Sequence, residues 1–324
     1  MFEMLVKRAL QSILVVFIIS ILAFVGINLV GDPIHLLVAP DASVGEIARA
    51  SHALGLDLPI SLQYWKFLVN ALHGDLGNSF VFNRPAIGLI LERMPATLEL
   101  AVLALLLSAV IGIPFGIWCG LKPNSRVHKI AMSLSILGVT VPVFWLGLIL
   151  ILVFSVNLQW LPSGGRGTTA NLLGIDVSFL TIDGFKHMVM PALTLAVHNV
   201  ALILRMTEAG TREVAGQEYV KFARAKGAGS WRLMRKHIAP NVMIPIVTVI
   251  GIELGHLIAF SLITETIFAW PGMGKLLIDS VLQLDRPVVV AYLMVVLVMF
   301  VFINFAVDML YLILDPRLRT RAGA

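Results

Sequence analysis

The sequence contains, from Ala96 to Leu121, the run ATLELAVLALLLSAVIGIPFGIWCGL, in which Glu99 is the one charged residue. A helix needs about 20 apolar residues to cross the roughly 30 Å of hydrocarbon in a bilayer. This run is longer than that requirement. It therefore predicts a transmembrane helix.

Runs of the same character occur on both sides of this segment. Ala9–Val30 is longer than the core of a signal peptide and lacks a small-residue cleavage pattern after it, so it is interpreted as a retained first span. The expected fold is an all-α integral membrane protein of about six transmembrane helices. Their approximate ranges are Ala9–Val30, Ala96–Leu121, Ile130–Val156, Met188–Met206, Val242–Ile263 and Val288–Leu314.

The composition agrees with a membrane location. The 324 residues are 58% hydrophobic and 13% charged, whereas soluble proteins carry about 25% charged residues. The single cysteine, Cys119, excludes a disulfide framework and a Cys/His metal cluster.

The charges predict which side of the membrane each loop faces. Lys and Arg gather at Lys7–Arg8, Lys122–Lys129, Arg205–Lys236 and in the C-terminal tail, while most acidic residues fall in the alternate loops. Because positive charge favours the inner side, both termini are predicted to be cytoplasmic. The net charge of +5 is then a topology signal, and no nucleic-acid partner is expected.

The loop before the fifth predicted span reads EYVKFARAKGAGSWRLMRKHIAPN, Glu218–Asn241. Tyr219, Phe222 and Ala223 share one face of a first short helix. Gly227 is predicted to end this helix, because glycine readily adopts the left-handed conformation, and Ser230 is predicted to cap a second one.

In the second short helix, Trp231, Met234 and Ile238 are predicted to line one side, and Pro240 follows. We call Glu218–Pro240 the elbow. Its apolar and basic faces predict either a helix pair lying on anionic lipid or a docking surface for a protein partner.

Inside the predicted spans, small residues, prolines and ionisable residues stand out. Gly112, Gly116 and Gly120 have the spacing of a helix-packing stripe, as do Gly251 and Gly255. Pro114, Pro142 and Pro191 are predicted to kink or break their helices.

Glu253 and His256 lie one turn apart near the middle of the fifth predicted span. They are interpreted as lining of a polar pathway, as an interhelical hydrogen-bonding pair or as a metal contact. One His with one carboxylate is too little for a dedicated metal site, and no metal is expected.

The elbow resembles the coupling loop of ABC-transporter permease subunits, whose pattern is E-A-A, three residues, Gly and a later Pro. Gly227, Pro240 and Ala223 fit this pattern, whereas Lys221 and Phe222 replace its Glu and first Ala. The residues around them are similar to the version in the dipeptide/oligopeptide branch. Other segments along the chain agree with that branch, and they are Gly74–Ser79, Arg93–Leu100, Pro142–Gly147, Trp160–Gly165, Pro271–Gly274, Asp308–Tyr311 and Asp315–Arg319.

The resemblance implies the type I ABC importer transmembrane fold in a bacterial inner membrane. It divides the chain into a first helix with an extracytoplasmic helical segment (1–94), a five-helix core with a coupling loop at 208–240 (95–315) and a cytoplasmic tail (316–324). The implied partners are a second homologous permease, two ATPase subunits and an extracytoplasmic binding protein that docks on the outer loops, Asp32–Met94 and Leu158–Lys186. The residues implied in ATPase coupling are Glu218, Tyr219, Lys221, Phe222, Ala223, Arg224, Ala225, Gly227, Ser230 and Pro240.

The implied function is to form half of the pathway for di- or oligopeptides. No phosphate-binding loop occurs in the sequence, so no ATPase activity, catalytic residue or cofactor is expected in this chain. The alternatives are import of a nickel chelate, glutathione or an opine-like solute, a self-sufficient secondary transporter, for which the halves show no convincing repeat, and a membrane scaffold or sensor without transport.

Overall fold

The computed structural model describes residues 2–29, 42–55 and 57–314. Their regular secondary structure is helical, apart from a two-stranded antiparallel hairpin in which Leu172 pairs with Ile175. They form two compact units, one of residues 96–270 and 302–314, the other of residues 2–95 and 271–301. The helices α5 (Ala86–Leu121) and α14 (Arg286–Leu314) contribute to both.

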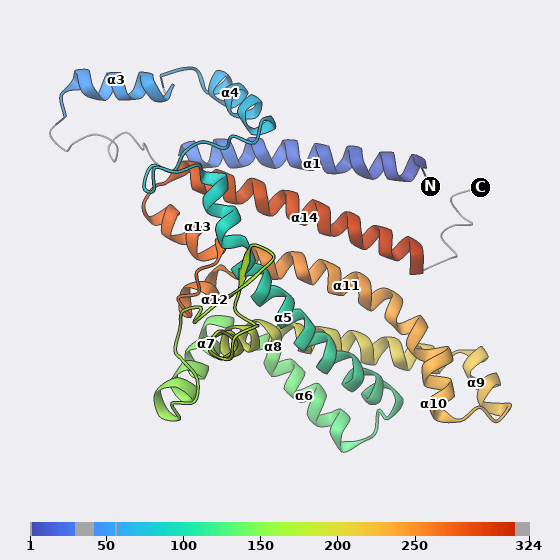
Figure 1. Ribbon diagram of the computed structural model, residues 1–324. Coiled ribbons are helices and arrows are strands. Elements are labelled where there is room, and N and C mark those ends of the chain that lie inside the picture. Colours follow the sequence, from blue (N-terminus) through green and yellow to red (C-terminus); the bar gives the residue numbers. More distant parts are fainter. Residues whose placement is uncertain (1, 30–41, 56, 315–324) are drawn as a thin grey trace. The chain divides into compact units, whose positions relative to one another are not determined.

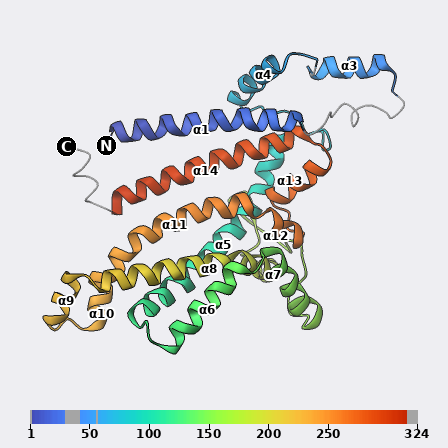
Figure 2. The same cartoon turned by 180° about the vertical axis from the view of Figure 1, so that it is seen from behind.

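The first unit holds most of the predicted spans. Figures 1 and 2 show α6, α8 and α11 side by side within it. Its other elements, with their bounds, are α6 (Arg126–Thr140), α7 (Val143–Leu150), η1 (Ile151–Asn157), β1 (Ala170–Leu172), β2 (Ile175–Val177), α8 (Ile182–Ala215), α9 (Glu218–Ala225), α10 (Ser230–Leu233), η2 (Met234–Ile238), α11 (Ala239–Phe260) and α12 (Leu262–Ile267).

The membrane spans differ in two ways from the six predicted ones. Within the part of the chain that the structure describes, four helical stretches are long and apolar enough to cross a bilayer, and their bounds are Ala86–Leu121, Ile182–Ala215, Ser230–Phe260 and Arg286–Leu310. A fifth is obtained if α6 and the α7–η1 pair count as one span. In α1 (Phe2–Leu29), the first predicted span, the apolar part is the shorter Ile13–Gly26.

The third predicted span, Ile130–Val156, is broken at Pro142, where the sequence predicted a kink or a break. The chain bends by 103° between Thr140 and Val143. Pro142 has no N–H to donate, and a proline disfavours the α conformation in the residue before it. Val141 accordingly has an extended backbone, with ψ 124°. By contrast, α5 and α8 continue through Pro95, Pro114 and Pro191.

The glycine stripe of α5 packs against α8, as its spacing predicts. A Cβ atom at Gly116 would lie 2.5 Å from the Cβ of Thr207, and one at Gly120 would lie 2.6 Å from the Cβ of Thr211. No real side chain fits at such distances. The two helices therefore touch through their backbones, which is how small residues hold membrane helices together.

Two carboxylates in the apolar helices have partners within the first unit. Glu99 is ion-paired with Arg166, whose Nη2 lies 3.2 Å from its Oε2, and it also accepts the N–H of Ser178. Buried Glu265 accepts the hydroxyls of Thr97 and Ser261 at 2.7 and 2.8 Å. Both carboxylates hold helices and loops together, which is the structural alternative to a role in transport.

The second unit contains α1, α3 (Val44–Leu54), α4 (Ile60–Leu72), α13 (Met273–Leu282) and the start of α14. The short helices α3 and α4 lie in the part of residues 1–94 that was expected to be helical after the first span. The Gly74–Ser79 motif has a structural role, because the Ser79 hydroxyl donates to the buried Asp285 carboxylate. Gly77 adopts φ +88°, a conformation that favours glycine.

Candidate functional site

The first arm of the elbow is α9, which ends at a glycine. Gly227 has φ +84°, and its N–H donates to the carbonyl of Arg224 at 3.0 Å. The N–H of Ala228 donates to the carbonyl of Ala223 at 3.2 Å. These two bonds form a Schellman motif with glycine in its left-handed position. The prediction that Gly227 ends the first helix is therefore confirmed.

The second arm of the elbow differs from the short capped helix that was predicted. Gly229 is the N-cap and Ser230 is the first helical residue, so the prediction of a Ser230 cap is wrong. The helix does not stop before Pro240, because α10 continues through η2 into α11, and Pro240 lies in the first turn of α11. A missing N–H is tolerated there. The second arm is thus a direct extension of a membrane span.

The elbow is fixed to the rest of the first unit by a cluster of buried side chains. Val220 of α9, Leu233 of α10 and Ile238 of η2 pack with Ile203 of α8 and with the first turns of α11. Ala223 and Ala228, on either side of the glycine, pack against the same cluster. The two arms are therefore attached to α8 and α11 as one body.

The prediction of which residues line the apolar side of the second arm is partly wrong. Ile238 is buried, but Trp231 is 70% exposed, and Leu233 takes the inner position instead. The cause is the π-helical turn of η2, in which residues five apart share a face. Val220 was missed because the apolar stripe predicted for the first arm runs through Tyr219 and Phe222, which are exposed.

The outer side of the elbow is aromatic and basic. Tyr219 is 45% and Phe222 is 62% exposed, and the Lys226 ammonium lies 4.6 Å from the centre of the Phe222 ring. Lys221 is ion-paired with Glu218 at 2.8 Å. The other exposed residues of α9, α10 and η2 are Arg224, Ala225, Ser230, Trp231, Arg232, Arg235 and Lys236. Exposed aromatic residues beside arginines are typical of the central part of a protein interface.

The second candidate site lies on α11. The Glu253 and His256 side chains are one turn apart, with Oε1 and Nδ1 separated by 3.7 Å, and they are 14% and 51% exposed. Both residues were predicted to lie near the middle of the span. Because α11 ends at Phe260, they lie near its end instead. Within the described residues, no group of three or more His, Cys, Asp or Glu side chains could hold a metal ion.

The fold has a known counterpart among solved structures. A chain of the MetNI methionine ABC transporter in an inward-facing conformation superposes with a TM-score of 0.54 over 70% of this chain and 96% of that one, at 18% identity. This likeness shows the fold alone, the transmembrane fold of an ABC importer.

The family follows from the sequence. Residues 112–320 match the family described as "Binding-protein-dependent transport system inner membrane component", and residues 1–101 match the corresponding N-terminal family. The chain belongs to this family of binding-protein-dependent transport system inner membrane components.

Curated relatives extend the match over nearly the full chain. The oligopeptide transport system permease protein AppB of Bacillus subtilis is 37% identical over 97% of this chain and 98% of its own length. The glutathione transport system permease protein GsiC of Escherichia coli is 35% identical over 98% and 99%. The probable D,D-dipeptide transport system permease protein DdpB of Escherichia coli K12 is 35% identical over 98% and 97%.

Family membership establishes several properties of this chain. It is a multi-pass inner membrane protein of a bacterial ABC importer, and it is the permease subunit rather than the ATPase. It works in a complex with an ATPase and a binding protein.

Proposed function

We propose that this chain forms half of the translocation pathway for di- or oligopeptides and that the elbow couples this pathway to a separate ATPase. The observation that carries the coupling role is the two-sided elbow. Its inner side is packed onto α8 and α11 through Val220, Leu233 and Ile238, while its outer side presents Tyr219 and Phe222. A docked partner that moves the outer side must also move the two helices attached to the inner side.

The mechanism follows from the continuity of the second arm with α11. The helix has no loop between Ser230 and Phe260 that could absorb a displacement. When ATP-driven closure of the ATPases shifts α9, the Gly227 corner and the buried cluster transmit the shift to α11 as a rigid-body motion. The residues proposed to couple to the ATPase are Glu218, Tyr219, Lys221, Phe222, Ala223, Arg224, Ala225, Gly227, Ser230 and Pro240. Of these, Ala223 packs against the buried cluster on the inner side of the elbow.

The proposed complex contains a second homologous permease and two ATPase subunits. In it both termini of this chain are cytoplasmic, residues 95–315 form the core, and the outer loops receive the binding protein. Support comes from the family description, which names a binding protein, and from the charge distribution of the sequence.

Peptides are the proposed cargo because the relatives AppB and DdpB are named for oligopeptide and D,D-dipeptide transport. Glutathione is the principal alternative, since GsiC is named for it at nearly the same identity. The experiment that tests the cargo is uptake by the complete complex in vesicles, with the cognate binding protein and either labelled dipeptides, labelled oligopeptides or labelled glutathione. Uptake of the peptides is expected. Uptake of glutathione alone would contradict the peptide proposal.

Glu253 and His256 are proposed to line the pathway. An ionisable side chain that faces lipid is costly, yet His256 is half-exposed on a membrane-spanning helix. A face toward the pathway would give this imidazole a polar environment. Replacing His256 with Leu is expected to change the KM for uptake while leaving the amount of complex in the membrane unchanged.

A further inference from the structure

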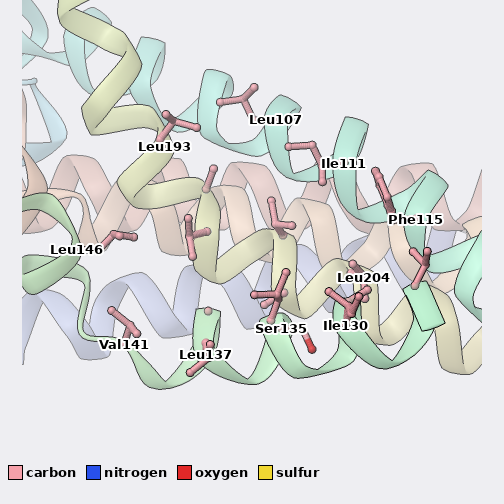
Figure 3. Close-up of a pocket in the computed structure, with 18 of the residues that line it drawn as sticks. Leu107, Ile111, Phe115, Ile130, Ser135, Leu137, Val141, Leu146, Leu193 and Leu204 are labelled. Atoms are coloured by element: carbon pink, nitrogen blue, oxygen red, sulfur yellow. The ribbon is translucent and has the colours of Figure 1, made fainter. Parts of the chain in front are cut away.

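An apolar pocket lies in the first unit between α5, α6 and α8. It has a volume of about 560 Å³. Figure 3 shows Leu107, Ile111 and Phe115 of α5 on one side of the pocket and Ile130 and Leu137 of α6 on the other. The lining is continued by α8, and also by Val141 and the first part of α7.

The pocket offers almost nothing to a polar ligand. Among the lining residues, all of which the structure describes, Ser135 and Trp145 alone carry a polar side-chain atom. The Ser135 hydroxyl is already bonded to the carbonyl of Met132 at 2.8 Å. Placing a polar group in such a site would cost its hydration without replacement. The occupant of the pocket must therefore be hydrocarbon at this depth.

The dimensions of the pocket fit a lipid tail. Its lining on α6 runs from Val127 to Gly138, about 16 Å at 1.5 Å per residue, close to the roughly 15 Å of hydrocarbon in one leaflet. Its volume of about 560 Å³ falls in the range of small-ligand sites, about 300–1,000 Å³.

Two cations flank one end of the pocket. Lys122 follows Phe115 by two helical turns on the α5 side, and its ammonium lies 5.6 Å from the centre of the Trp118 ring. Arg126 begins α6 one turn before Ile130, and both cations are exposed. Arg126 forms no ion pair with another described residue. A hydrocarbon site with cations at its mouth is complementary to an anionic phospholipid.

We propose that this pocket holds one acyl chain of an anionic phospholipid, whose phosphate group binds Lys122 and Arg126. The loop that carries these cations is predicted to be cytoplasmic, and anionic lipids attract basic residues at the cytoplasmic face of the membrane. Such a lipid fills the space between α5 and α6 and supports the same ends of α5 and α8 that pack through Gly116 and Thr207.

The test measures lipid retained by the complete complex, purified in mild detergent, with native mass spectrometry. Ala131 lines the pocket and Ser133 is an exposed residue of the same helix outside it. Ala131→Phe is expected to abolish the retained phospholipid, and the matched control Ser133→Phe is expected to keep it. Equal retention in both variants would overturn the proposal. Loss of the second permease from the Ala131→Phe complex would also overturn it, because the pocket would then be a subunit contact.

A second measurement avoids any change inside the pocket. The wild-type complex is stripped of lipid and supplied with phosphatidylglycerol or phosphatidylethanolamine in a competition experiment. A preference for phosphatidylglycerol is expected, and it should fall by about five-fold for each of the substitutions Lys122→Gln and Arg126→Gln. An absence of preference in the wild type, or a preference unchanged in the double variant, would contradict the phosphate site.

Discussion

Leu233 and Ile238 are five residues apart and are both buried in the same hydrophobic cluster, because the turn between them is π-helical. A π-helical turn rotates the chain by less per residue than an α-helix does. It allows Leu233 and Ile238, five residues apart, to face the same cluster. The elbow is therefore tied to the membrane span by side-chain packing as well as by the backbone, which is the basis of the coupling role proposed for it.

The two glycines of the elbow differ in their backbone requirement. Gly227 has φ +84° and Gly229 has φ −63°, and a Cβ would meet no atom within 4 Å at either position. Gly227→Ala is therefore expected to cost about 1–2 kcal/mol through backbone strain alone, and Gly229→Ala almost nothing. Thermal unfolding of the purified complex checks this. Equal effects of the two substitutions would show that the left-handed corner does not matter.

The buried and the exposed residue of α10 should separate stability from docking. Leu233→Ala is expected to lower the stability by about 2–5 kcal/mol, because it empties part of the cluster. Trp231→Ala, at an exposed position, should change stability by less than about 0.5 kcal/mol. Thermal unfolding of both variants gives the comparison, and a larger effect for Trp231→Ala would mean that Trp231, rather than Leu233, is the inner residue.

The Glu99–Arg166 pair should be sensitive to the loss of one partner. Its side chains are only 5% and 15% exposed, so Arg166→Met leaves a buried carboxylate uncompensated, at a cost of about 3–5 kcal/mol. The double variant Glu99→Gln/Arg166→Met is expected to recover much of this loss. Unfolding midpoints of the wild type, the single variants Glu99→Gln and Arg166→Met and the double variant test the pairing. Additive effects of the two substitutions would argue against it.

The α5 glycine stripe offers a test with a control on the same helix. Gly116→Ala places a Cβ against Thr207, whereas a Cβ at Gly88 meets nothing within 4 Å. The first substitution is expected to destabilise the protein by about 1–3 kcal/mol through overpacking. Gly88→Ala is expected to be neutral or slightly stabilising. Unfolding of both variants in the same detergent provides the measurement, and a neutral Gly116→Ala would contradict the close approach of α5 and α8.

The sequence was sufficient for the features that depend on composition and local conformation. Long apolar runs predicted α5, α8, α11 and α14, because few other structures can bury such runs. The left-handed Gly227 could be predicted because glycine alone adopts that conformation at little cost.

Other features depend on tertiary packing and could not be predicted in the same way. The sequence predicted a kink or break at Pro114, Pro142 and Pro191 alike, but it did not distinguish Pro142, where the helix breaks, from the other two, through which the helices continue. The π-helical turn of η2 has no sequence signal and moved Trp231 to the outside of the elbow. The short hairpin of β1 and β2 was likewise not foreseen, because its three-residue strands are too short for a periodic pattern.

The most direct test of the coupling role is ATP-driven uptake by the complete complex in vesicles, with the ATPase rate measured in parallel. Phe222→Ala removes an exposed aromatic side chain from the elbow, and Phe185→Ala removes one from the first turn of α8, outside the elbow. Phe222→Ala is expected to weaken docking by at least about 1 kcal/mol, or five-fold. It should then reduce the solute transported per ATP hydrolysed, while Phe185→Ala leaves that ratio unchanged. A normal ratio in Phe222→Ala and in a Gly227→Leu variant would contradict the proposal that this elbow couples the permease to its ATPase.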